Sequence, residues 1–258
     1  MRVFILRKKV VVGVCAALCA ALVLSAGATI LFGGGSDIAA SAQQRQIPVY
    51  SVDTDEKRIA ISFDAAWGAE KTTEIMDILD DYGIKTTFFL VGFWVEKYPD
   101  KVVEIAERGH EIGNHSSTHP QLSTLTAEQI MMEVNKCSDQ IEALTGTPTT
   151  LIRPPYGDYN DTVVTTLRDN GYEVIQWSVD SLDWKSYGVQ SMVKRVTENV
   201  EPGSIVLFHN NSDYILEALP IILENLTKNG YEIVPVSELL IQGDAYVDQA
   251  GVMRAREG

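Results

Sequence analysis

The sequence predicts an α/β fold built on a parallel sheet that curls into a closed or nearly closed barrel of seven strand–helix units. Amphipathic helical segments alternate with short β-branched or aromatic runs through residues 48–242. These runs are apolar on both faces, which is typical of parallel strands covered by helices. Seven units in about 190 residues favour a barrel. An open doubly wound sheet is the alternative, but no Gly-rich nucleotide fingerprint follows the first strand.

Glycines mark the ends of four predicted helices, because the left-handed residue just past a helix favours glycine. They are Gly83, Gly109, Gly171 and Gly230. The best-defined helix covers residues 126–144, where Thr126 and Gln129 have the spacing of a capping box. The seven predicted strands cover residues 58–63, 86–91, 111–114, 151–153, 173–179, 204–209 and 232–236.

The N-terminus carries basic residues followed by an apolar segment. Residues 1–9 contain Arg2, Arg7, Lys8 and Lys9, and residues 10–32 are 23 uncharged residues. At a rise of ~1.5 Å per residue, this helix would cross a hydrocarbon core of ~30 Å. We therefore expect a transmembrane signal anchor with residues 1–9 in the cytoplasm. A cleaved signal peptide is the alternative, because residues 40–42 read Ala-Ser-Ala.

The remaining boundaries follow from composition. Residues 33–47 are rich in small and polar types and are expected to form a flexible stem. Residues 48–242 are expected to form the folded domain, and residues 243–258 a C-terminal tail. Asp and Glu number 35 against 21 Lys and Arg, so nucleic acid is excluded as a favoured partner. Three cysteines are too few for a disulfide framework.

Polar residues end several of the predicted strands. Parallel α/β folds carry their ligand sites at the carboxyl ends of strands, so these residues are the candidate site. They are Asp64, His115, His119, Arg153, Tyr156, Asp180, Asp183 and His209. His115 and His119 are four residues apart, a spacing that allows both imidazoles to share a divalent cation.

Five segments in this order resemble the polysaccharide deacetylases of carbohydrate esterase family 4, which contain the NodB homology domain. The segments read SFDAAWG, HSSTH, RPPYG, DSLDW and LFH. The resemblance covers about residues 48–242 and implies an irregular (β/α)7 barrel that removes N-acetyl groups. The SFDAAWG form, joined to an N-terminal anchor, is similar to the sporulation polysaccharide deacetylase B group.

The resemblance also implies a role for each residue of the candidate site. Asp64 would be the catalytic base and His209 the catalytic acid. His115 and His119 would bind a divalent metal, expected to be zinc. Arg153 would orient Asp64, and Asp180 would support His209. The backbone N–H of Tyr156 would hold the oxyanion, and Trp184 and Leu207 would line the acetyl pocket.

One position departs from the family pattern. The first motif of the family carries a second Asp directly after the base, which serves as the third metal ligand, and here that position is Ala65. Catalytic zinc sites have three protein ligands, so two imidazoles should hold the ion more weakly.

These observations predict a membrane-anchored, extracytoplasmic, metal-dependent deacetylase of N-acetylated cell-wall glycan. The expected substrate is peptidoglycan, in a spore or a sporulating cell. One alternative is a catalytically silent protein that binds the glycan without turnover. Another is an amidohydrolase of the same fold that acts on a small amide.

Overall fold

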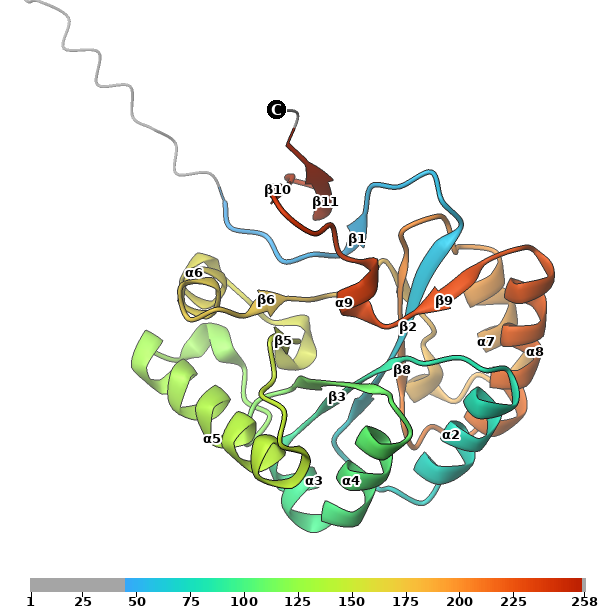
Figure 1. The fold of residues 1–258 in the computed structure, drawn as a ribbon, viewed down its shortest axis with the longest axis horizontal. Helices are drawn as coiled ribbons and strands as arrows, with labels where there is room; N and C mark the ends of the chain where they lie inside the picture. The colour runs from blue at the N-terminus through green and yellow to red at the C-terminus, as the bar shows by residue number, and fades with distance from the viewer. Residues whose placement is uncertain (1–44, 257–258) are drawn as a thin grey trace, which may run out of the picture. The chain divides into compact units, whose positions relative to one another are not determined.

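Figure 1 shows the computed structural model, which describes residues 45–256. The predicted cytoplasmic end, the predicted anchor at residues 10–32 and most of the predicted stem lie outside the described residues. Among the helices of residues 45–256, none is both long and apolar enough to cross a membrane.

The centre of the fold is a curled sheet of eight strands in which every pairing is parallel. The order is β6-β5-β4-β3-β2-β8-β7, and β9 pairs with the first residues of β2. The strands are β2 (Arg58–Ala65), β3 (Thr87–Leu90), β4 (Glu111–Asn114), β5 (Leu151–Ile152), β6 (Glu173–Val174), β7 (Val179–Asp180), β8 (Ile205–His209) and β9 (Glu232–Val234). This curled parallel sheet agrees with the barrel expectation.

The predicted strand at residues 173–179 is two short strands, β6 and β7. β6 pairs with β5, and β7 pairs with β8, so one segment supplies both ends of the sheet. Between them, Ile175 forms a parallel bridge with Val49, and Gln176 N donates to Val49 O at 2.7 Å. Pairing with the distant Val49 segment therefore interrupts the strand.

Helices surround the sheet, as Figure 1 shows. They are α2 (Thr72–Asp81), α3 (Gly92–Lys97), α4 (Pro99–Glu107), α5 (Ala127–Thr145), α6 (Asp161–Asp169), α7 (Val189–Thr197), α8 (Ile215–Lys228) and α9 (Val236–Leu239). The capping box of α5 is formed as predicted, with Thr126 and Gln129 each bonded to the backbone of the other. All four glycines expected to follow helices have positive φ, between 66° and 84°.

The alternation of side chains along β2 divides the core and places the first candidate residue. Phe63 belongs to the core shared with the helices and stacks on Phe88, with ring centroids 5.0 Å apart. Ser62 and Asp64 belong to the other face of the strand, where both contact Arg153. A two-residue period thus keeps Asp64 out of the helix-side core.

Both expected boundaries of the domain differ from the structure. Residues 243–258 were expected as a tail, but β10 (Ala245–Val247) and β11 (Val252–Ala255) form a three-stranded sheet with β1 (Ser51–Val52). At the other boundary, Ile47 is buried and its carbonyl accepts from Arg168 Nη2 at 2.8 Å. The folded part therefore begins before residue 48 and continues beyond residue 242.

Candidate active site

Asp64 lies at the carboxyl end of β2 and forms a buried ion pair with Arg153. Arg153 Nη1 donates to Asp64 Oδ1 at 2.7 Å. Its Nη2 donates to Ser62 Oγ at 2.9 Å and to Gln176 O at 3.1 Å, and the guanidinium lies 4.2 Å from the Phe89 ring centroid. Arg153 is fully buried. These contacts fix Arg153 in place, so it can hold the Asp64 carboxylate in one orientation, which is the role that the resemblance implies.

The same contacts keep Asp64 ionised. Burial would raise the pKa of Asp64, but the charge and hydrogen bond of Arg153, with smaller contributions from His115 and His209, lower it below 3.8. The Oδ2 atom of Asp64 is the oxygen that does not bind Arg153. Asp64 therefore presents a carboxylate oxygen that is able to accept a proton.

His209 ends β8 beside Asp64, because Asp64 and His209 are paired in register. Asp183 Oδ1 lies 2.7 Å from His209 Nδ1, and Asp183 Oδ2 accepts from the backbone N–H of His209 at 2.7 Å. Burial would lower the pKa of His209, but the hydrogen bond and charge of Asp183 outweigh burial and raise it. The raised pKa favours the protonated form of His209, which is the form that a catalytic acid needs.

The partner of His209 is Asp183, and not Asp180 as the resemblance implied. Asp180 Oδ1 instead accepts from the backbone N–H of Leu182 at 2.8 Å. Leu182 has a φ of 53°, so the chain turns sharply between the two carboxylates. Asp180 forms the turn, and the turn delivers Asp183 to His209.

His115 and His119 come together next to Asp64. Their ring centroids are 5.0 Å apart. His115 Nδ1 contacts Arg153 O at 2.6 Å, and because a carbonyl only accepts, Nδ1 carries the proton and Nε2 faces Asp64 Oδ2 at 3.5 Å. Burial lowers the pKa of His115, and it lowers the pKa of His119 to about 4. Both imidazoles are therefore neutral at pH 7, the form that binds metals.

The loop carrying these histidines is held by Glu133 of α5, a residue that sequence reasoning missed. Ser116 and His119 both have positive φ, 65° and 59°, so the loop adopts a conformation that side chains disfavour. Glu133 Oε2 accepts from the backbone N–H of Thr118 at 2.7 Å and of Ser117 at 3.1 Å, and Oε1 accepts from the Thr118 hydroxyl at 2.9 Å. Glu133 therefore compensates for the strained loop.

The residues present fit a divalent cation with an incomplete set of protein ligands. His119 Nδ1 is buried without a hydrogen-bond partner among the described residues, and His115 Nε2 faces a carboxylate oxygen. Ala65 is fully buried, packs in the helix-side core and does not line the cavity. No group of three or more His, Cys, Asp or Glu side chains in the described part of the chain is arranged as a metal site. Two imidazoles are one ligand short of a catalytic zinc site.

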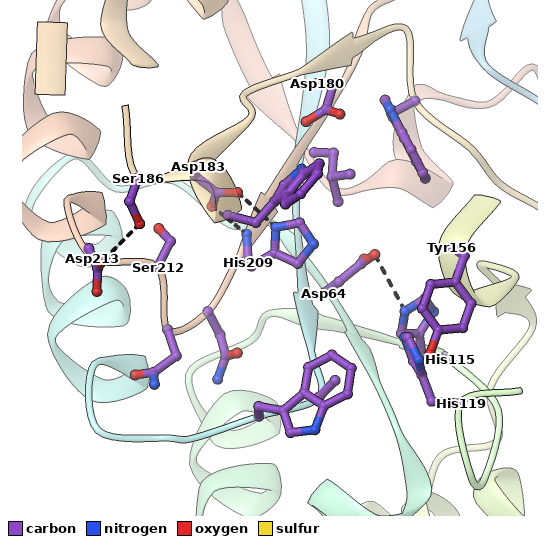
Figure 2. A pocket seen from close by; sticks show the side chains of 17 residues that line it. Asp64, His115, His119, Tyr156, Asp180, Asp183, Ser186, His209, Ser212 and Asp213 are labelled. Atoms are coloured by element: carbon purple, nitrogen blue, oxygen red, sulfur yellow. Dashed lines mark hydrogen bonds and ion pairs between the residues drawn. The ribbon is translucent and has the colours of Figure 1, made fainter. Parts of the chain in front are cut away.

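A cavity of about 790 Å³ brings the candidate residues together, as Figure 2 shows. It is lined by eight of the nine residues that the resemblance assigned: Asp64, His115, His119, Tyr156, Asp180, Trp184, Leu207 and His209. Arg153 lies behind Asp64. Tyr156 has a left-handed backbone, with a φ of 62°, and its ring lies 4.5 Å from that of His119. Trp184 is exposed at the rim and Leu207 is buried in the wall.

Other lining residues were not assigned a role from the sequence. They are Ala66, Trp67, Trp177, Asp183, Ser186, Asn210, Asn211, Ser212 and Asp213. Trp67 stands within the first motif and lies edge-on to His119, with centroids 5.1 Å apart. Its place in that motif, three residues after the expected base, is the feature of the sequence that points to it.

Several known proteins are similar to this chain over most of its folded part. Residues 51–175 match the polysaccharide deacetylase family. The peptidoglycan-N-acetylglucosamine deacetylase of Bacillus cereus is 38% identical over 196 residues, which are 74% of this chain and 92% of that protein. This chain belongs to the polysaccharide deacetylase family. The peptidoglycan-N-acetylmuramic acid deacetylase PdaC of Bacillus subtilis is 35% identical, and the match spans 73% of this chain but 40% of PdaC.

Among solved structures of the polysaccharide deacetylase family, one similar protein is a pseudoenzyme. BA3943 of Bacillus anthracis, a pseudoenzyme of carbohydrate esterase family 4, is 34% identical with a TM-score of 0.72, and the match covers 75% of this chain and 69% of that chain. A mutant of BA3943 with restored enzymatic activity has a TM-score of 0.73. The family therefore supplies both active and inactive proteins of similar fold.

Proposed function

We propose that this polysaccharide deacetylase hydrolyses the N-acetyl groups of amino sugars in peptidoglycan. The observation that carries the proposal is a pair of titratable side chains in one cavity whose pKa values are shifted in opposite directions. The pKa of Asp64 is lowered beside Arg153, whereas the pKa of His209 is raised beside Asp183. Two neighbouring groups whose pKa values are pushed apart are suited to act as base and acid.

The reaction assigns one proton transfer to each group. Asp64 takes a proton from water, whose oxygen forms a bond to the acetyl carbonyl carbon. The C–N bond then breaks, and His209 gives its proton to the nitrogen, so the products are acetate and a free amine. Arg153 holds Asp64, and the backbone N–H of Tyr156 is proposed to stabilise the oxyanion. A divalent cation held by His115 and His119 would supply Lewis-acid polarisation of the acetyl carbonyl.

Acetate release from N-acetylated wall glycan tests the proposal. We expect release by the wild type, and losses on the order of 10² to 10⁴ in Asp64→Asn and in His209→Ala. Asp139 is exposed on α5 and does not line the cavity, so Asp139→Asn serves as a control with the same charge change and should match the wild type. Equal rates in either site variant would overturn the assigned roles.

A second candidate function is glycan binding without turnover. The observation that favours it is Ala65, which leaves two imidazoles where the family pattern supplies a third ligand. The similarity to the pseudoenzyme BA3943 supports the same alternative. Binding of wall glycan without acetate release, in protein loaded with zinc, would favour this function over hydrolysis.

We also propose that residues 10–32 hold the protein in the cell membrane with the catalytic domain outside, in a sporulating cell. The four basic residues before an uncharged stretch of 23 residues support this placement. Protease added to protoplasts should then remove the domain from the membrane fraction. A domain protected inside intact cells would reverse the topology, and a free domain in the medium would indicate cleavage of the N-terminal segment.

A further inference from the structure

The loop that follows β8 is anchored from behind by α2. Lys71 Nζ, just before α2, donates to the carbonyl oxygens of Ser212 at 2.6 Å and of Asp213 at 3.3 Å. The side chain of Asn210 also binds the loop to α2, because its Nδ2 donates to Thr72 Oγ1 at 3.0 Å. These bonds fix the loop through its backbone and leave its later side chains at the cavity wall.

Two buried oxygen atoms of this loop lack a hydrogen-bond partner among the described residues. They are Asn211 Oδ1 and Ser212 Oγ. Ser212 is 8% exposed, and both residues line the cavity. A buried polar atom without a partner costs free energy, which a bound group can recover. Since an amide oxygen only accepts, the group that completes Asn211 Oδ1 must donate a hydrogen bond, whereas the Ser212 hydroxyl can accept or donate one.

Asp213 and Ser186 extend the same wall. Ser186 Oγ donates to Asp213 Oδ2 at 2.7 Å, and the Oδ1 atom of Asp213 has no donor within residues 45–256. In Figure 2, Ser186, Ser212 and Asp213 lie on one side of His209, and the two metal-site histidines lie on the other. We refer to residues 211–213 and Ser186, which bring acceptor oxygens to this wall next to His209, as the donor-binding subsite.

The acidic side chains that line the cavity disfavour a ligand with a free carboxylate. Four aspartates line it, and no Lys or Arg does, within the described chain. Asp64 is paired with Arg153 and Asp183 with His209. Asp180 and Asp213 have no such cation at their carboxylates among residues 45–256. On the Asp213 side of His209, away from the two metal-site histidines (Figure 2), a ligand carboxylate would therefore meet uncompensated like charge.

We propose that the donor-binding subsite binds hydroxyl groups of the sugar next to the reacting N-acetyl group. It thereby selects an uncharged N-acetylated glycan against one with free carboxylates. The identity of the ligand as a glycan rests on the proposed function. The selection itself rests on three features of the described cavity. Two buried oxygens lack a hydrogen-bond partner, one carboxylate oxygen of Asp213 has no donor, and no Lys or Arg lines the cavity.

Calorimetric binding of two tetrasaccharides tests this subsite. One is N-acetylchitotetraose, and the other is the peptide-free peptidoglycan tetrasaccharide, which carries free lactyl carboxylates. We expect the wild type to bind the neutral ligand at least about tenfold more tightly. Asp213→Asn should reduce that ratio to below about threefold, because it removes like charge and a charge-assisted acceptor. Ser212→Ala should weaken neutral binding without the same gain for the charged ligand.

The matched control is Asp139→Asn, which changes the net charge equally and should keep the wild-type ratio. High salt should reduce the ratio, since the discrimination is electrostatic. Equal wild-type affinities, or an unchanged ratio in a folded Asp213→Asn, would overturn the subsite. Acetate release is measured separately. If no acetate appears but the binding ratio still depends on Asp213, the proposed hydrolysis fails and the subsite stands.

Discussion

Asp183 forms two hydrogen bonds with His209, one carboxylate oxygen bonding Nδ1 and the other accepting from the backbone N–H, each at 2.7 Å. The carboxylate thus sets both the tautomer and the orientation of the imidazole, and leaves Nε2 to face the cavity. The same role is played by the carboxylate partner of histidine in many hydrolases. Asp180 lines the cavity but makes no hydrogen bond to His209, so two nearby carboxylates can be compared directly.

Asp183→Asn should move the alkaline limit of activity to lower pH. Asp183 raises the pKa of His209, and the proton that the acid donates is held up to that pKa. Removing the charge lowers the pKa of His209, so the acid loses its proton earlier as pH rises. Profiles of kcat/KM against pH measure the shift. Asp180→Asn should leave the limit closer to that of the wild type, and an equal shift in both variants would contradict the assignment of Asp183.

Asp64→Asn should also lower stability, because it leaves Arg153 buried without its ion-pair partner. The expected loss is about 3–5 kcal/mol at neutral pH, measured by urea unfolding. The pKa of Asp64 is lowered in the folded state, so its contribution is complete above 3.8 and is lost as pH falls through the folded value. The difference between wild type and variant should therefore shrink in acid. A difference that grows as pH falls would contradict the buried ion pair.

Glu133→Ala should loosen the loop that carries His115 and His119. Three hydrogen bonds to Glu133 are lost, and two strained residues lose their support. We expect zinc affinity to fall by about tenfold or more, as for other residues that position metal ligands. Glu133→Gln keeps one acceptor and should recover part of it. Glu142→Ala, exposed on the same helix, is the control, and an equal loss there would reduce Glu133 to a structural role.

Ala65→Asp should make stability depend on zinc. The new carboxylate begins at a fully buried apolar position, where a charge without a partner is costly. A cation bound at His115 and His119 would be the partner for this charge. Thermal unfolding in chelator should show a lower Tm than wild type, and added zinc should restore part of the loss. Recovery that persists after both histidines are changed to Ala would contradict this metal site.

The sequence predicts the parts of the fold that depend on local pattern. The predicted strand at residues 111–114 has the same bounds as β4, and the α5 capping box forms as its spacing indicates. Strand-end placement also brings Asp64, His115, His119 and His209 to one cavity. These successes share a cause, since period, caps and strand ends are set by neighbouring residues.

The errors occur where distant segments or a special turn decide the outcome. The strand at residues 173–179 is split because Val49 pairs with Ile175. The expected tail is ordered because β11 pairs with β1 from the other end of the domain. Whether Asp180 or Asp183 reaches His209 depends on the left-handed backbone of Leu182, and the residue type at that position does not predict this conformation. Such long-range pairings and backbone conformations are not encoded in local periodicity.

Product analysis of wall glycan after incubation with the zinc-loaded protein distinguishes hydrolysis from glycan binding without turnover. Mass spectrometry of the sugars and an assay of free acetate are run on the same sample. Hydrolysis by Asp64 and His209 predicts one free amine for each acetate released, with both products reduced on the order of 10² to 10⁴ for Asp64→Asn. Glycan that is bound by the wild type yet keeps every acetyl group would contradict the proposed hydrolysis.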